Sequence, residues 1–501
     1  MVQRRMDDSP VLAVEFDAYA IGAFAAYLLL LIAIGLYSTR FSSKGIAEYF
    51  IGGRKMNRFV VALSAVVSGR SAWLLLGVTG MAYARGPSAI WAVVGYIVVE
   101  IFLFLYYAKR LRNFTGKRNC ITIPDFFAER FGDHDGKLRI TIVSIFLVFM
   151  IGYISAQFVA GGKAFASGFG LQIETGIVLT ALIVLAYTTV GGFLAVSLTD
   201  MFQAMFMILA LVVLPVVAIA NFGGLAELLQ HLSAMDNMFV DPFAISVGAA
   251  IGFVGIGLGS PGNPHILARY MSIDDSAQLR VAAIIGTVWN VLMAWGAVFI
   301  GLAGRAYFPD VNMLPAADTE NLFPVLAQQH LHPVLFGVVL ASIFAAIMST
   351  ADSQLLVAAS SVVRDIYEKI IRKDEEISQS RLVFYSRLVV FMLVVISLLV
   401  GFWAEELVFW LVLFAWAGLG ASIGPTSILA LYWKGTTRAG IFAGLITGTV
   451  VTIGWYYMPG LTDILYELIP GFIAALAATW LVSLFTGKSA DTEKAFRDMF
   501  P

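Results

Sequence analysis

The sequence predicts an all-α, polytopic membrane protein with thirteen transmembrane helices, ten of which form two inverted repeats of five helices each. Three observations predict this fold class. The 501-residue chain is 59% hydrophobic and only 13% charged, with a mean hydropathy of +0.85, whereas a soluble domain carries about 25% charged residues. Apolar segments close to the roughly 20 residues that cross a bilayer recur along the whole chain. Two of these segments, five apart in order, are interrupted by glycine, proline and serine residues.

The composition also excludes several classes of protein. A disordered chain is poor in aromatic residues, and this one has 10 Trp, 18 Tyr and 38 Phe. A net charge of −1 offers no basic field for nucleic acid. The chain contains no HExxH, no GxxxxGK[ST], no paired cysteines and no histidine cluster. We therefore expect neither an enzyme nor an ATP-driven pump, no cofactor, no transition metal and no cleaved signal sequence.

Thirteen apolar segments are expected to cross the membrane. They cover residues 16–38, 57–84, 88–108, 138–166, 173–190, 193–220, 243–268, 281–304, 333–363, 384–402, 406–432, 437–457 and 463–485. These segments divide the chain into an N-terminal region with an extra first helix (1–56), a first repeat (57–220), a second repeat (221–432), and two accessory helices with a short cytoplasmic tail (433–501).

The distribution of positive charge predicts the orientation. An odd number of crossings places the two termini on opposite sides of the membrane. If the C-terminus is cytoplasmic, 26 of the 32 Lys and Arg residues lie on the inner side, and Arg269 is among them. Because inner loops are rich in Lys and Arg, we expect the N-terminus outside and the C-terminus in the cytoplasm, with the protein in the cell membrane.

Two segments are predicted to be broken helices. The second segment contains Ser-Gly-Arg-Ser at 68–71, and the seventh contains GIGLGSPGNP at 255–264. In hydrocarbon a broken helix is tolerated only where it lines a protein cavity. Helices 2–6 and 7–11 then form two sets that each begin with a broken helix, which is typical of a secondary transporter with its site at the midplane. Gly440, Gly444 and Gly448 in the twelfth segment mark close helix packing.

Three ionisable residues are expected at membrane depth: Arg70, Asp200 and Asp352. Such residues are candidates for function by default, although an Arg–Asp pair could also simply lock two helices together. Ser349, Asp352 and Ser353 share one helix face through their i, i+3 and i+4 spacing. Hydroxyl and carboxylate oxygens, with backbone carbonyls freed near 67–70, are ligands that suit a hard cation such as Na⁺.

Seven stretches resemble the sodium/solute symporters and, within them, the sodium/proline symporters. They are SAWLLLG (71–77), IPDFF (123–127), GGFLAVSLTD (191–200), PHILAR (264–269), MST (348–350), QLLV (354–357) and AWAG (415–418). The resemblance covers nearly the whole chain. It implies a LeuT-like fold with thirteen helices and a five-plus-five inverted repeat, in agreement with the pattern of broken segments.

The resemblance also implies three sets of site residues. The main Na⁺ site falls on Val67, Arg70, Ala346, Ser349 and Thr350, with the first two acting through their carbonyls. A second cation or proton site falls on Asp200, Ser349, Asp352 and Ser353. The substrate cavity falls on Ser71, Trp73, Tyr153, Ile256, Ser260 and Pro264.

The chain departs from the pattern of the proline symporters at several of these positions. Gly69 and Arg70 stand where those proteins look to have Asp-Met, and Asp352 stands where they look to have a small polar residue. We expect Arg70 to lean into the cation region and Asp352 to neutralise it. Alternatively, Arg70 replaces Na⁺ as a fixed cation, and Asp352 or Asp200 takes up a proton. Ile256 and Ser260 replace what look like a Trp and a Tyr, which widens the cavity.

The predicted function is therefore a cation-coupled symporter that imports a small zwitterionic solute, with proline as the leading candidate among amino acids and Na⁺ as the coupling ion by resemblance. Two alternatives stay open. One is a proton-coupled or uncoupled carrier (a uniporter or exchanger). The other is a non-transporting solute sensor with the same fold. The expected partners are the solute and the lipid bilayer, with no protein partner and no nucleic acid.

Overall fold

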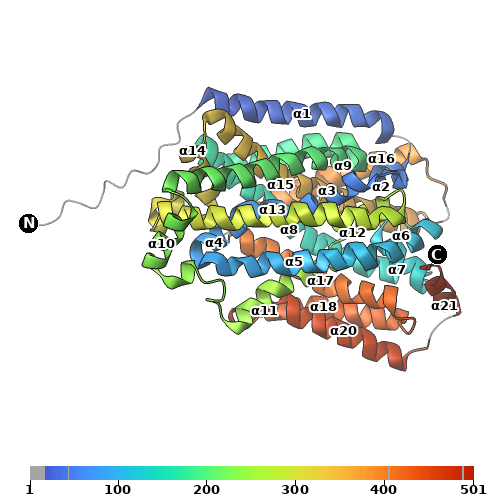
Figure 1. Ribbon diagram of the computed structural model, residues 1–501. Helices are drawn as coiled ribbons and strands as arrows, with labels where there is room; N and C mark the ends of the chain where they lie inside the picture. The colour runs from blue at the N-terminus through green and yellow to red at the C-terminus, as the bar shows by residue number, and fades with distance from the viewer. Residues whose placement is uncertain (1–16, 43–44, 374, 404–406, 488–489, 501) are drawn as a thin grey trace, which may run out of the picture.

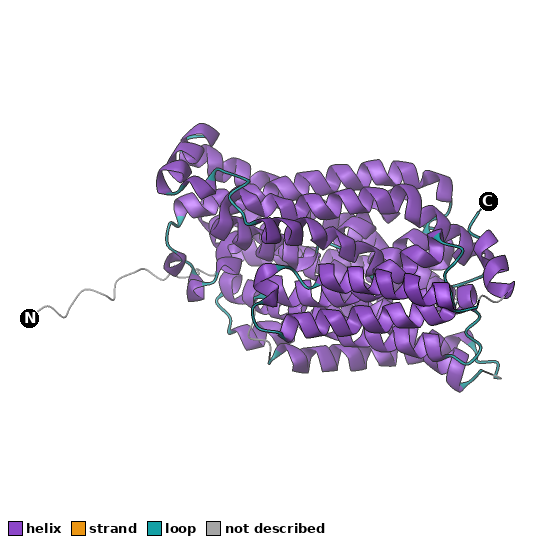
Figure 2. Ribbon diagram, turned by 90° about the horizontal axis from the view of Figure 1, so that it is seen from below, coloured by secondary structure: helices purple, strands orange, loops and turns teal. Residues whose placement is uncertain are grey.

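The computed structural model describes residues 17–42, 45–373, 375–403, 407–487 and 490–500, which form an all-helical bundle (Figures 1 and 2). Within these ranges no β-strand forms, and a single parallel bridge pairs Met56 with Ile273. The α-helices are α1 (Ala18–Ser42), α2 (Ile46–Ile51), α3 (Arg58–Ser68), α4 (Thr79–Arg85), α5 (Ile90–Phe102), α6 (Ala108–Lys117), α7 (Ile123–Phe131), α8 (Lys137–Phe169), α9 (Ile173–Phe222), α10 (Leu225–Met235), α11 (Val247–Gly255), α12 (Pro264–Ser272), α13 (Leu279–Tyr307), α14 (Leu322–His330), α15 (Pro333–Ser360), α16 (Gln379–Gly401), α17 (Val408–Tyr432), α18 (Arg438–Tyr457), α19 (Leu461–Ile464), α20 (Leu468–Phe485) and α21 (Ala490–Arg497).

Ten helical segments of the described chain are long and apolar enough to cross a membrane. Three shorter apolar segments, Arg58–Ser68, Ile173–Thr189 and Val247–Gly262, accompany them. Each of the thirteen predicted segments overlaps one of these helical regions, so the hydropathy pattern located the helices well. The count of thirteen crossings, the inverted repeat and the domain boundaries stay predictions.

The first predicted break is confirmed. α3 begins after Asn57, whose side-chain oxygen accepts hydrogen bonds from the backbone N–H groups of Phe59 and Val60, each at 3.0 Å. The helix ends at Ser68, and Ser71 takes a left-handed conformation with φ of +49°. Helical structure resumes with Trp73–Val78 and continues into α4.

The second predicted break is confirmed as well. α11 ends at Gly255, a tight 3₁₀ turn covers Ile256–Gly262, and Asn263 is extended before α12 begins at Pro264. Proline suits this first helical position because its missing N–H would have no partner there. Glycine at 259 is required by packing, since a Cβ atom there would lie 1.9 Å from Nε1 of Trp416.

The packing of the long helices defines an interior and a periphery. α8, α15 and α17 are the most buried of the long helices, whereas α1 runs along one edge of the bundle and α18 and α20 along the opposite edge (Figure 1). The close packing predicted at Gly440 and Gly444 occurs within the chain, because a Cβ atom at either would lie 1.9 Å from a hydroxyl of α20. α1 begins at one end of the bundle and α21 lies at the other (Figure 1).

A sharp bend at Gly192 divides α9 at the point where the sequence separates two predicted segments. Gly192 has φ of +61° and ψ of −171°, a conformation that only glycine adopts readily. A Cβ atom there would lie 2.9 Å from the ring of Tyr49.

Gly192→Ala should therefore lower the stability by about 1–3 kcal/mol, the usual range for a residue held in such a conformation. Thermal unfolding of the purified protein measures this as a lower Tm. Gly152→Ala is the matched control, because nothing lies within 4 Å of its Cβ position in α8. Equal Tm values for the two variants would contradict the role given to Gly192.

Candidate functional site

Oxygen atoms of α3 and α15 gather at the first break. The Ser349 hydroxyl lies 3.1 Å from the Ala346 carbonyl oxygen and 3.4 Å from that of Val67. The Thr350 hydroxyl donates to the carbonyl of Ser68 at 2.9 Å. All of these groups are buried. The structure thus brings together four of the five residues predicted for the main cation site and adds Ser68.

The fifth predicted ligand lies differently. The Arg70 carbonyl accepts the backbone N–H of Leu74 at 3.1 Å and so belongs to the helix that follows the break. The Ser68 carbonyl was missed because the sequence alone does not say which carbonyls of a broken turn face the neighbouring helix. The oxygen set matches the preference of hard cations for hydroxyl and carbonyl ligands.

The second predicted cation site contains an arginine. Arg269 of α12 forms an ion pair with Asp200 at 3.2 Å and donates to the Ser353 hydroxyl. It also donates to the Ser64 hydroxyl at 3.0 Å and to the His265 carbonyl at 2.8 Å. Arg269 is only 1% exposed. Counting it among the charges of an inner loop was therefore wrong, and Asp200 and Ser353 share its guanidinium group.

Asp352 lies close to this cluster and forms no salt bridge with any residue of the described chain. One of its carboxylate oxygens accepts the Ser353 hydroxyl at 3.3 Å, and the other has no hydrogen-bond partner in the described part of the chain. The Ser353 hydroxyl also lies 2.5 Å from the Ser349 carbonyl, which connects the two predicted cation sites. All four residues of the second predicted site are thus buried in one region of the bundle.

The predicted contact between Arg70 and Asp352 is wrong. The Arg70 guanidinium pairs with Glu100 of α5, and its Nε–H donates to the Asn290 side chain of α13 at 2.8 Å. Asn290 in turn donates to Glu100 at 2.7 Å, and the guanidinium lies 3.6 Å from the centre of the Tyr96 ring. The charge of Arg70 is therefore neutralised by Glu100 of α5 and not by Asp352.

Sequence reasoning overlooked Glu100 and Asn290. A signal was present, since Glu100 lies in the middle of the apolar segment 88–108 and Asn290 in the middle of 281–304. A charged residue at such a depth needs a partner, and Arg70 is the partner that Glu100 has.

A small, nearly closed cavity lies between the two broken helices, with room for about one water molecule. Its lining residues come from both breaks, from α5 and α8, and from α17: Gly69, Arg70, Trp73, Tyr96, Tyr153, Ile256, Val412, Leu413 and Trp416. Every one of them is buried. The Trp416 Nε1–H donates to the Ile256 carbonyl at 2.8 Å, which fixes α17 against the second break.

Half of the predicted substrate residues line this cavity: Trp73, Tyr153 and Ile256. Ser71 adjoins it, because the Tyr153 hydroxyl lies 3.5 Å from the Ser71 Oγ. Pro264 lines a different small cavity, together with Thr122 and Ser360. Ser260 is buried but does not line the cavity between the breaks.

A buried cluster of charges contacts the beginning of α17, the helix that contributes Val412, Leu413 and Trp416 to the cavity. Lys163 of α8 pairs with Asp318 at 2.7 Å and with Glu320 at 2.6 Å. The Glu320 carboxylate also accepts the first backbone N–H groups of α17, those of Val408 at 3.1 Å and Phe409 at 2.9 Å. The Phe409 ring stacks on Trp73 with ring centres 5.7 Å apart. The Lys163–Glu320 ion pair thus contacts the first turn of α17, and Phe409 in that turn packs on Trp73 of the cavity wall.

A second buried ion network lies at the end of the bundle to which α7 belongs. Arg139 pairs with both Asp125 and Asp365, and Arg364 pairs with Asp125 at 3.2 Å. Burial alone would raise the pKa of Asp125, but Arg364 and Arg139 hold that pKa below its usual value. The network ties α7 and α8 to the helical segment Ser361–Ile371 that follows α15.

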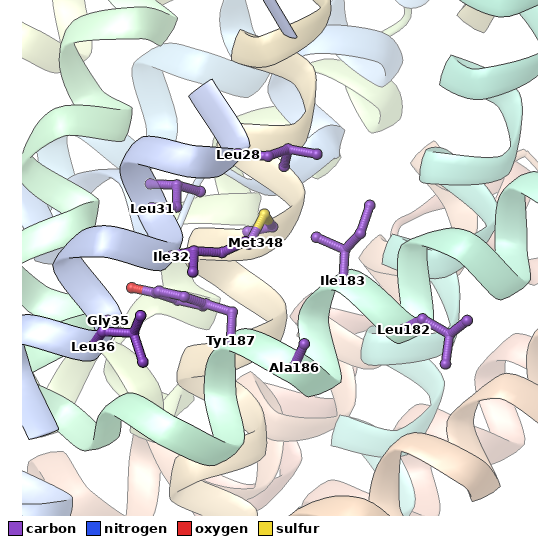
Figure 3. A pocket seen from close by; sticks show the side chains of 10 residues that line it. All are labelled: Leu28, Leu31, Ile32, Gly35, Leu36, Leu182, Ile183, Ala186, Tyr187 and Met348. Atoms are coloured by element: carbon purple, nitrogen blue, oxygen red, sulfur yellow. The ribbon is translucent and has the colours of Figure 1, made fainter. Parts of the chain in front are cut away.

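A wider groove of about 340 Å³ runs between α1, α9 and α15 (Figure 3). Its walls are mostly aliphatic, and Leu31, Ile183 and Met348 point into it (Figure 3). The hydroxyl of Tyr187, which also lines the groove, forms a hydrogen bond with the Thr199 hydroxyl. The residues that line this groove carry no charge, whereas Arg70 lines the smaller cavity between the broken helices.

Comparison with known proteins gives a consistent family match. The model of the sodium:solute symporter family matches residues 49–448. Sodium/proline symporters of two Staphylococcus aureus strains, JH9 and JH1, are each 39% identical over 479 residues, which is 93% of this chain and 92% of theirs.

Two solved structures share the fold. A substrate-bound, outward-open Na⁺-coupled sialic acid symporter superposes with a TM-score of 0.82 at 18% identity, covering 95% of this chain and 100% of that one. A nucleobase-cation-symport-1 family transporter, in a closed conformation with bromovinylhydantoin bound, gives a TM-score of 0.55 at 14% identity, covering 90% and 98%.

Proposed function

Because this chain belongs to the sodium:solute symporter family, we propose that it is a Na⁺-coupled symporter that imports a small zwitterionic solute, with proline the first amino acid to test. The family consists of transporters, not enzymes, and the ten long apolar helices identify an integral membrane protein. The proposed orientation has the N-terminus outside the cell and the C-terminus in the cytoplasm.

The observation that carries the proposal is that two broken helices face one cavity beside a cluster of buried oxygen atoms. The oxygen cluster and the cavity share the break in α3: Val67 and Ser68 contribute carbonyls to the cluster, and Gly69 and Trp73 line the cavity. A cation that holds α15 against α3 therefore shapes one wall of the solute cavity. Coupling of this kind requires that the cation bind one conformational state better than the other.

Uptake of radiolabelled L-proline into proteoliposomes tests this directly. We expect an inward Na⁺ gradient to accelerate uptake by about tenfold or more over equal Na⁺ on both sides, because a gradient drives net flux only through coupled binding. Dissipating the gradient with an ionophore is the control. Absence of gradient-driven uptake for every amino acid would overturn the symporter proposal, and binding without flux would identify a sensor.

A proton-coupled carrier is the second candidate, and Asp352 is the observation that favours it. Its buried carboxylate forms no salt bridge among the described residues, and one of its oxygens has no hydrogen-bond partner there. Protonation would remove the charge that burial disfavours. A pH gradient without Na⁺ would then drive uptake. Uptake that follows the Na⁺ gradient alone would rule this candidate out.

A further inference from the structure

The cavity between the two broken helices presents hydrogen-bond donors to whatever occupies it. Arg70 and Tyr96 line it, together with Trp73. The Trp73 Nε1–H and the Tyr96 hydroxyl are buried and have no hydrogen-bond partner in the described structure. No carboxylate side chain lines the cavity. Its polar groups therefore suit a ligand that carries strong acceptors.

The Arg70 side chain is held by Asn290 and Glu100, which lie outside the cavity, and by Gly69 and Tyr96, which line it. Its Nε–H donates to the Asn290 side chain, its Nη1 donates to the Gly69 carbonyl at 3.2 Å, and its Nη2 forms the ion pair with Glu100. A guanidinium carries five N–H donors, so two donors remain after these three contacts. The face of the group rests on the Tyr96 ring at 3.6 Å, a favourable cation–π arrangement.

Glu100 and Asn290 do not line the cavity. They act as positioning residues: Glu100 balances the charge of Arg70, and Asn290 bridges the two side chains. A fixed guanidinium with donors to spare is the geometry that recognises a carboxylate. The aromatic walls of Trp73, Tyr153 and Trp416 suit the apolar or cationic remainder of a small solute.

The geometry points to Arg70 as the residue that binds the carboxylate of the transported solute, with Tyr96 and Trp73 as additional donors. This inference rests on the proposed symport function and assigns the residue that recognises the carboxylate of its solute. The inference also gives a role to Arg70, which stands where the proline symporters look to have a methionine.

The test compares an acid with its amide. Binding of L-proline and of L-prolinamide to the purified full-length protein is measured by thermal shift, because a bound ligand raises the Tm by mass action. The wild type should prefer the acid by about 10- to 100-fold, the range expected for hydrogen bonds to a charged group.

The informative variant is Arg70→Met combined with Glu100→Gln. The single Arg70 change would leave Glu100 buried and unpaired, whereas the double change removes both charges. We expect its acid-over-amide preference to fall below about threefold. Arg85→Met, on the exposed Arg85 at the end of α4, is the control and should keep the wild-type preference.

The possible outcomes distinguish a failure of this inference from a failure of the proposed symport function. If no amino acid raises the Tm of the wild type, both the proposed symport function and this inference are overturned. If the wild type binds an amino acid but does not discriminate it from its amide, or if the double variant keeps the discrimination, the inference alone is overturned. Should the double variant show no cooperative unfolding, Arg70→Lys replaces it: a weaker preference supports the inference, and an unchanged one overturns it.

Discussion

Ser349→Ala and Thr350→Val, combined in one protein, should abolish Na⁺-driven uptake, and each alone should raise the half-saturating Na⁺ concentration by about tenfold or more. The Ser349 hydroxyl lies between the carbonyls of Ala346 and Val67, and the Thr350 hydroxyl contacts the carbonyl of Ser68. Each change removes one oxygen from the proposed coordination of the cation, and a hydrogen bond or ligand to a charge contributes about 1.5–3 kcal/mol. Initial uptake rates across a Na⁺ titration give the measurement.

Two matched controls separate a lost ligand from a damaged helix. Ser342 lies on the same helix and is equally buried, but its hydroxyl donates to the Val339 carbonyl within α15 at 2.7 Å. Ser342→Ala should therefore leave the Na⁺ dependence unchanged. Thr350→Ser keeps the hydroxyl and should retain most of the coupling. A double variant at 349 and 350 with the Na⁺ response of the wild type would show that the cation binds elsewhere.

The sequence was sufficient to locate the helices and both breaks because these depend on local properties. Apolar length marks a membrane helix, and Gly255–Pro264 contains too many glycines and prolines for a continuous one. Spacing also placed Ser349, Asp352 and Ser353 on one face of α15, where the structure has them within one buried region. Each of these conclusions concerns residues a few positions apart on a single helix.

The sequence could not assign the partners of the buried charges, because partners are brought together by the packing of separate helices. Arg70, Glu100 and Asn290 lie on three different elements and are up to 220 positions apart. Asp352 looked like a partner for Arg70 because both were visible as charges in apolar segments, whereas Glu100 had been overlooked. Arg269 looked like a loop residue because it directly follows the predicted segment 243–268, but α12 extends to Ser272 and Arg269 is buried.

The ion pair between Arg269 and Asp200 leads to the second large prediction. Arg269→Met should lower the stability by about 3–5 kcal/mol, because removing one partner leaves a buried charge uncompensated. Asp200 would keep only the hydroxyls of Ser64 and Ser68 as donors, at 2.5 and 3.3 Å. Adding Asp200→Asn removes that charge, so the double variant should unfold at a higher Tm than the Arg269→Met single variant.

The same pair of variants decides whether Asp200 takes part in coupling. In the structure a guanidinium already occupies the position between Asp200 and Ser353, so we expect one coupling cation, at Ser349 and Thr350, and a mainly structural role for Asp200. The double variant should then keep Na⁺-driven uptake, measured at a temperature well below its Tm. If it folds and binds solute but no longer responds to a Na⁺ gradient, Asp200 is a coupling residue, and Arg269 must leave it during the transport cycle for a cation to enter.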